Sequence, residues 1–75
     1  MPKYYFDIKD GVDFPDLYGS DWKDLTAARN EAVRFSAEVL KEMPNRFWNS
    51  ELWTMTVSDC AKKKLFTLKF IAESV

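Results

Sequence analysis

The chain has no histidine, one cysteine and only two glycines among its 75 residues. Without histidine it cannot build Ser-His-Asp or Cys-His catalytic systems, histidine-containing metal sites or histidine proton relays. A single cysteine excludes an internal disulfide framework, and its occurrence without histidine excludes a structural zinc site. A chain this short must therefore gain its stability from an efficient apolar core or from self-association.

Other absences narrow the function further. No segment is long and apolar enough to cross a bilayer, and residues 1–7 lack the apolar stretch and cleavage site of a signal peptide. Gly11 and Gly19 are too isolated to form a Gly-rich phosphate loop. We expect a cytoplasmic protein that is not an enzyme, with no catalytic residues, no cofactor, no small-molecule substrate and no membrane partner.

The residues that are present are typical of a folded domain, since 47% are hydrophobic and 16% are aromatic. A disordered tail would have few aromatics and a large net charge, whereas the formal net charge here is −1. Binding to DNA or RNA requires a basic face that displaces counterions from phosphates. The nearly balanced charge therefore argues against a nucleic-acid partner.

Four segments have the composition of β-strands. Residues 4–9 alternate apolar and polar side chains, and Asp10-Gly11 after them is typical of a hairpin turn. A short second strand is predicted at Val12 and Phe14, ending at Pro15 because proline has no N–H. Residues 52–58 and 64–71 alternate again, separated by a turn.

One amphipathic helix is predicted from Leu25 to Met43, with Asp24 as its N-cap and Pro44 as its stop. Residues 45–50 are expected to form a loop. One arc of the helix is mostly apolar and consists of Leu25, Ala28, Ala32, Phe35, Ser36, Val39, Leu40 and Met43. The order β-β-α-β-β predicts a single α+β domain over residues 1–75, with the helix on one face of a four-stranded antiparallel sheet.

Two groups of residues suggest chemistry but are better explained without it. Asp7, Asp10, Asp13 and Asp16 recur every three residues, yet they lack the alternate spacing and closing Glu of a calcium loop. We interpret them as solvated turn carboxylates and expect no metal site. Cys60 precedes three lysines that would lower a thiol pKa, but the chain has no histidine to act as a base. We expect no catalytic role for it.

Two basic features each have two interpretations. Lys62–Lys64, followed by Phe66 and Phe70, form either a nucleic-acid patch or a charged hairpin tip that blocks aggregation, and we favour the second. Arg29 falls inside the apolar arc of the helix. Either its stem packs while the guanidinium reaches water, or it forms a structural ion pair with a carboxylate of the first hairpin or the loop over 15–21.

The chain has more large apolar side chains than one helix can cover. Both alternating sets of residues 52–58 and 64–71 contain them, and a contiguous exposed group of this kind marks an interface. We therefore expect a protein-interaction module, a homodimer or a partner for another protein, that uses the open sheet face or an edge strand. The residues predicted to form this interface are Tyr5, Trp48, Leu52, Trp53, Leu65 and Ile71.

The chain resembles, over nearly its full length and most specifically in its first 32 residues, a family of short bacterial proteins that carries only a domain-of-unknown-function label. The matching features are Met-Pro-Lys-Tyr-Tyr-Phe-Asp over 1–7, the Asp10-Gly11 turn, and Asp24-Leu25 followed by Ala27-Ala28-Arg29. The resemblance implies a stand-alone β-β-α-β-β domain with no assigned activity.

A second likeness rests on Phe14-Pro15-Asp16-Leu17 and Gly19 before an Ala-rich helix, which is similar to HicB-type antitoxins. It implies a domain that binds and neutralises an RNA-cleaving toxin, and a strand between Gly19 and the helix that the sequence pattern does not predict.

Overall fold

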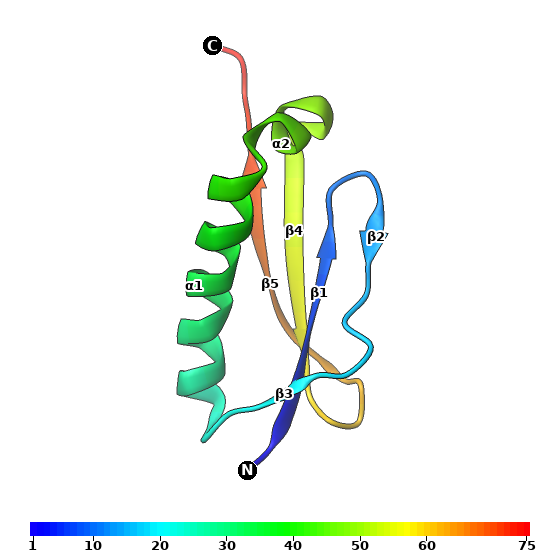
Figure 1. Cartoon of the computed structure of the whole chain (residues 1–75), viewed down its shortest axis with the longest axis vertical. Coiled ribbons are helices and arrows are strands. Elements are labelled where there is room, and N and C mark those ends of the chain that lie inside the picture. The colour runs from blue at the N-terminus through cyan, green and yellow to red at the C-terminus, as the bar shows by residue number, and fades with distance from the viewer.

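The computed structural model describes residues 1–75, and Figure 1 shows a sheet with one long helix beside it and a short helix near one end. The α+β class and the antiparallel sheet are confirmed. A short third strand and a second helix were not predicted. In chain order the elements are β1 (Lys3–Lys9), β2 (Asp13–Phe14), β3 (Ser20–Asp21), α1 (Leu25–Glu42), α2 (Pro44–Ser50), β4 (Leu52–Ser58) and β5 (Lys64–Ile71).

The strands lie in the order β2-β1-β4-β5, with β3 pairing with β1 as well, and every pairing is antiparallel. Phe6 of β1 lies opposite Val57 of β4, and Met55 of β4 lies opposite Leu68 of β5. Both central strands therefore present one alternating apolar set to α1. The strands β2 and β5 form the two edges of the sheet.

The helix α1 begins and ends close to the predicted residues. The Asp24 carboxylate accepts a hydrogen bond from the Ala27 N–H at 2.9 Å, which confirms the predicted N-cap. The buried stripe of the helix is made of small residues, Ala28, Ala32 and Ser36. Small side chains let α1 approach the sheet closely, and Ser36 Oγ lies 3.6 Å from Met55 Sδ of β4.

Residues 44–50 form the helix α2, so the predicted loop over 45–50 is wrong. Pro44 disfavours continuation of α1, but its fixed φ and missing N–H suit the first turn of a new helix. Glu51 ends α2 in the left-handed region at φ 58°, and its N–H donates to the Phe47 carbonyl. Phe47 is buried, which accounts for a large aromatic residue in a segment that was expected to be a loop.

The core is small, because only ten of the 75 residues are buried. It contains Tyr4, Phe6, Ala28, Ala32, Phe47, Trp53, Met55 and Val57. Neither helix is long and apolar enough to span a membrane. The limited burial leaves many apolar side chains at the surface, and their distribution over the two sheet edges is uneven.

Candidate protein-interaction surface

The outer edge of β1 is covered along its length. Residues 8–9 pair with β2 and residues 3–4 pair with β3. Between these pairings the Phe6 N–H donates to Asp16 Oδ2 at 3.1 Å, so a side chain satisfies the backbone where no strand does. Asp16 Oδ1 also accepts from the Gly19 N–H at 2.9 Å, which fixes the loop against β1. The edge of β1 is therefore occupied by two short strands and by the Asp16 carboxylate.

Gly19 allows the loop to lie this close to β1. Its φ is +70°, in the left-handed region, and a Cβ atom built there would lie 2.9 Å from the Tyr4 carbonyl oxygen. A side chain at position 19 would therefore be both strained and too close to backbone. The loop sequence thus seals the β1 edge only with glycine at this position.

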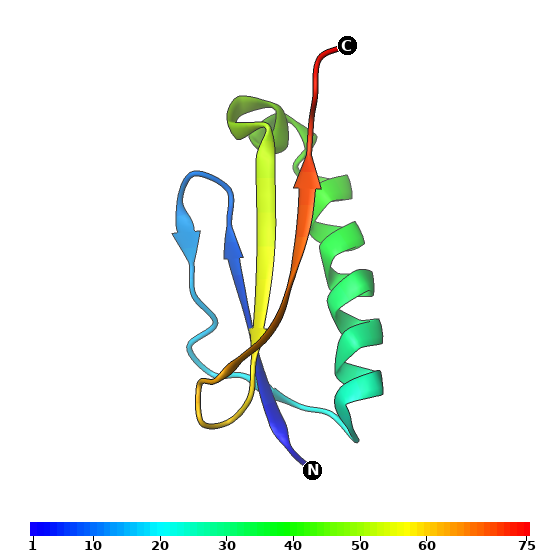
Figure 2. The ribbon, with the colours of Figure 1, turned by 180° about the vertical axis from the view of Figure 1, so that it is seen from behind.

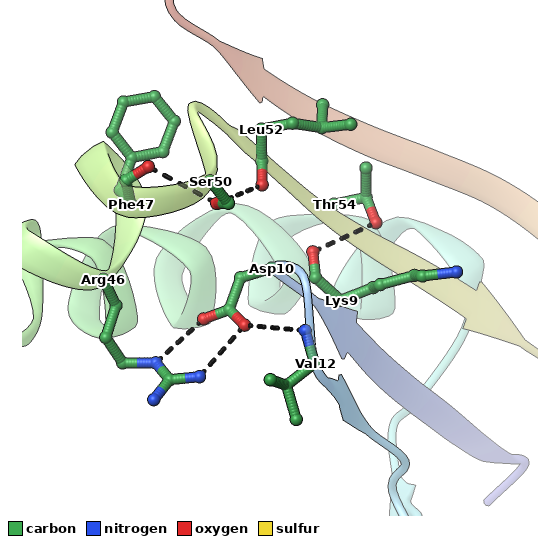
Figure 3. A network of polar contacts seen from close by, with 8 residues as sticks. All are labelled: Lys9, Asp10, Val12, Arg46, Phe47, Ser50, Leu52 and Thr54. Atoms are coloured by element: carbon green, nitrogen blue, oxygen red, sulfur yellow. Dashed lines mark hydrogen bonds and ion pairs between the residues drawn. The ribbon is translucent and has the colours of Figure 1, made fainter.

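An ion pair ties the tip of the first hairpin to α2 (Figure 3). Arg46 Nε and Nη2 donate to the two carboxylate oxygens of Asp10 at 2.9 and 3.1 Å, and the Asp10 side chain is 6% exposed. The hydrogen bond from Arg46 is the main reason that the pKa of Asp10 lies below its ordinary value. The guanidinium carbon also lies 4.9 Å from the centroid of the Phe14 ring, so Arg46 stabilises β2 as well.

The opposite edge, formed by β5, has no such cover. The Ala72 N–H donates to the Glu51 carbonyl at the end of the β4–β5 pairing. Because hydrogen-bonded and non-hydrogen-bonded pairs alternate in an antiparallel ladder, even-numbered residues of β5 bond to β4. The N–H and C=O groups of Thr67 and Lys69 therefore point away from the sheet. In Figure 2 no strand lies beyond β5, and α1 runs alongside it.

The side chains of β5 are also largely exposed. Phe70 is 52% exposed, Ile71 is 55% exposed and Leu65 is 36% exposed. A register shift between Val57 and Ser58 of β4 leaves Leu65 as an extra residue on β5, which is a β-bulge. The regular part of the edge therefore runs from residue 66 to residue 71.

A groove of about 490 Å³ lies between α1 and β5. Val33, 61% exposed, and Leu25, 44% exposed, line its helix side, and Phe66 and Leu68 line its strand side. Arg29 also lines the groove. It is exposed and takes part in none of the three ion pairs, which join Lys9 to Asp13, Arg34 to Glu31 and Arg46 to Asp10. Arg46 therefore forms the hairpin ion pair that was considered for Arg29.

The six residues predicted for the interface lie in different surroundings. Trp48, Leu52 and Ile71 are 62%, 45% and 55% exposed, and Leu52 lies opposite Ile71 in the β4–β5 register. Trp53 is only 3% exposed, so its assignment to the surface is wrong. It faces α1, on the same side of β4 as Met55.

Tyr5 is half-buried, because the Lys62 ammonium lies 3.4 Å from the centroid of its ring. The middle of the far sheet face is also not apolar. It carries Thr54, Thr56 and Thr67, whose hydroxyls make hydrogen bonds that include a Thr56–Thr67 contact of 3.1 Å. The sequence predicts an apolar surface on the sheet face away from α1, and this surface is absent at the centre of the sheet.

Phe70 was missed as a surface residue because its alternation places it with the core-facing set. Its ring centroid lies 4.9 Å from that of Phe47, and the Phe47 centroid lies 5.4 Å from that of Trp48. Phe70, Phe47 and Trp48 join β5 to α2 at one corner. The position of β5 at the sheet edge, which the sequence does not reveal, explains its exposure.

The structure contains no cluster of three or more Asp, Glu, Cys or His side chains that could hold a metal ion. Cys60 is a free, exposed thiol in the turn between β4 and β5. No curated protein and no solved structure matches the chain. A family model described as a domain of unknown function (DUF6894) matches residues 3–71, so the chain belongs to the DUF6894 family.

Proposed function

We propose that this chain is a non-enzymatic protein-interaction module that associates with a second copy of itself through the edge strand β5. The observation that carries the proposal is the contrast in backbone pairing, since Thr67 and Lys69 point their N–H and C=O groups outward while the β1 edge is covered. Addition of a strand to such an edge provides main-chain hydrogen bonds directly.

The small core supports the proposal. A domain with ten buried residues gains little from burial alone, and covering more apolar surface by oligomerisation is a common remedy. Leu65, Phe70 and Ile71 lie on β5 itself, so pairing of this edge would cover them. Lys64 and Lys69 on the strand discourage indiscriminate pairing with other chains.

The polar far face argues against the other route considered, association through the open sheet face. Stable homodimer interfaces have an apolar centre, whereas Thr54, Thr56 and Thr67 occupy the centre of this face. We propose the cytoplasm as the site of action, because the exposed thiol of Cys60 suits a reducing compartment.

A second candidate function is an antitoxin-like domain that neutralises an RNA-cleaving toxin. One observation favours it: β3 lies between Gly19 and α1 and pairs with β1, as the likeness to HicB-type antitoxins implies. Co-purification of a ribonuclease with the tagged chain would support this function. Recovery of the chain with no nuclease would count against it.

The variant Lys69→Pro tests the edge-strand proposal. Proline removes an N–H that points away from β4, so the variant should keep its fold but lose the pairing site. The matched control is Lys69→Ala, which keeps the N–H. In sedimentation analysis at micromolar concentration we expect dimers for the parent and Lys69→Ala and monomers for Lys69→Pro, all with the same circular dichroism spectrum. Self-association is refuted if the parent chain sediments only as a monomer at about 100 µM, a concentration comparable to the dissociation constant of a weak dimer.

A further inference from the structure

We infer that the second copy pairs with β5 in one antiparallel register, in which Leu68 lies opposite Leu68 of the second copy on the two-fold axis. This inference rests on the proposed self-association and specifies its geometry. It follows from the order of side chains along β5 and from the direction of the backbone groups.

The alternation of the strand limits the possible registers. A two-fold axis perpendicular to the sheet keeps the α1-facing side chains of both copies on the same face. The axis must therefore pass through a residue and not between two residues. The positions nearest the middle of β5 are Thr67, Leu68 and Lys69.

Two of these three positions create poor cross-strand pairs. With the axis at Lys69, this residue would face Lys69 of the second copy, and like charges directly opposite are destabilising. With the axis at Thr67, Lys69 would face the bulged Leu65 of the second copy, so an ammonium group would lie against an apolar side chain and the pairing would run beyond the regular part of the edge. Each arrangement costs desolvation or repulsion without a compensating contact.

The axis at Leu68 gives compatible pairs over the regular part of the edge. Phe66 faces Phe70 of the second copy, Leu68 faces its equivalent, and Thr67 faces Lys69 of the second copy. Aromatic pairs of this kind are among the favourable cross-strand contacts. The exposed ring of Phe70 is then covered, and no two lysines are opposed.

The backbone fits the same register. Thr67 and Lys69 carry the outward N–H and C=O groups, so they would exchange both hydrogen bonds with Lys69 and Thr67 of the second copy. Leu68 points its backbone toward β4 and would form a non-hydrogen-bonded pair with its equivalent. At such a pair the two Cα atoms approach to about 4.5 Å, within the range that a disulfide spans.

Cysteine cross-linking between the two copies tests this register. In a Cys60→Ser background, Thr67→Cys, Leu68→Cys and Lys69→Cys are oxidised at equal concentration and resolved on a non-reducing gel. We expect Leu68→Cys to cross-link at least about tenfold faster than the other two, because Thr67 of one copy lies two residues, about 7 Å, along the strand from its equivalent. A mixture of Thr67→Cys and Lys69→Cys should form the mixed disulfide, which tests the register with Leu68 intact.

The outcomes separate the register from the proposed function. If Thr67→Cys or Lys69→Cys alone cross-links fastest, or if no position cross-links although the Cys60→Ser chain sediments as a dimer, the register is wrong and self-association stands. If the Cys60→Ser chain and the parent both sediment as monomers, self-association itself fails. Circular dichroism under reducing conditions, identical to that of the parent, verifies that each cysteine variant is folded.

Discussion

The two edges of the sheet differ in how their backbone groups are satisfied. The edge beside β1 is closed by two short strands, the Asp16 carboxylate and a loop that only glycine permits at position 19. The edge formed by β5 has a regular stretch over residues 66–71, exposed aromatic and aliphatic side chains, and no further strand paired with it. The sheet is therefore covered on one side only. The chain supplies partners for the backbone of the β1 edge and supplies none for the outer side of β5.

The largest effect is expected from opening the closed edge. Asp16→Ala removes the acceptor for the Phe6, Tyr18 and Gly19 N–H groups. We expect the free energy of unfolding, measured by urea denaturation, to fall by about 3 kcal/mol, because each hydrogen bond to a charged group contributes about 1.5–3 kcal/mol and solvent compensates in part. The control Asp16→Asn keeps one acceptor oxygen and should lose less. Equal losses for both variants would show that the hydrogen bonds do not stabilise this edge.

A smaller effect is expected from releasing the hairpin that carries β2. Arg46→Met removes the partner of Asp10, whose side chain is nearly covered, and should lower the melting temperature by several degrees. Arg29→Met is the matched control, because Arg29 is exposed and makes no ion pair, and its melting temperature should stay within about 1 °C of the parent. A loss at Arg29 as large as that at Arg46 would contradict the assignment of the structural ion pair to Arg46.

The same ion pair makes part of the stability depend on pH. The Arg46 hydrogen bond holds the pKa of Asp10 below its ordinary value of 3.8, so protonation of Asp10 is harder in the folded chain than in the unfolded chain. This contribution is fully present above the unfolded pKa and is lost as pH falls through the folded pKa. Urea titrations between pH 5 and 2.5 should show a shallower loss of stability for Asp10→Asn than for the parent. Parallel curves would exclude the contribution.

The smallest effect is expected at the surface of the closed edge. The Lys9–Asp13 pair spans 3.9 Å and both side chains are at least 70% exposed. Asp13→Ala should therefore change the free energy of unfolding by less than about 0.5 kcal/mol in urea denaturation. A larger loss would mean that this pair, and not the Asp16 carboxylate alone, protects the β1 edge.

Local signals in the sequence were sufficient for the main elements. The bounds of β4 and β5 match the alternating segments, and Asp24 caps α1 as its side chain and position indicate. Pro44 was interpreted as a stop, which is correct for α1. Its second role, as the first residue of α2, was missed because a six-residue segment with no periodicity gives no helix signal.

The interface could be predicted only in part, because exposure depends on strand order. Alternation placed Trp53 and Phe70 on β-strands correctly, but only the sheet topology decides that Trp53 lies in the centre and Phe70 at an edge. The covering of the β1 edge could not be predicted from the sequence either. Asp16 accepts from Phe6, ten positions away, and Arg46 donates to Asp10, 36 positions away. Contacts of that sequence separation require the three-dimensional register.

For the proposed self-association, the covered edge of β1 also limits the size of the assembly. A domain with two receptive borders could be extended at both ends, and its sheets could grow into ribbons of indefinite length. A domain with one free edge strand can pair with only one second copy across a two-fold axis. In the proposed assembly, the Asp16 carboxylate would help to limit growth to a finite complex, and its loss should lower solubility as well as stability.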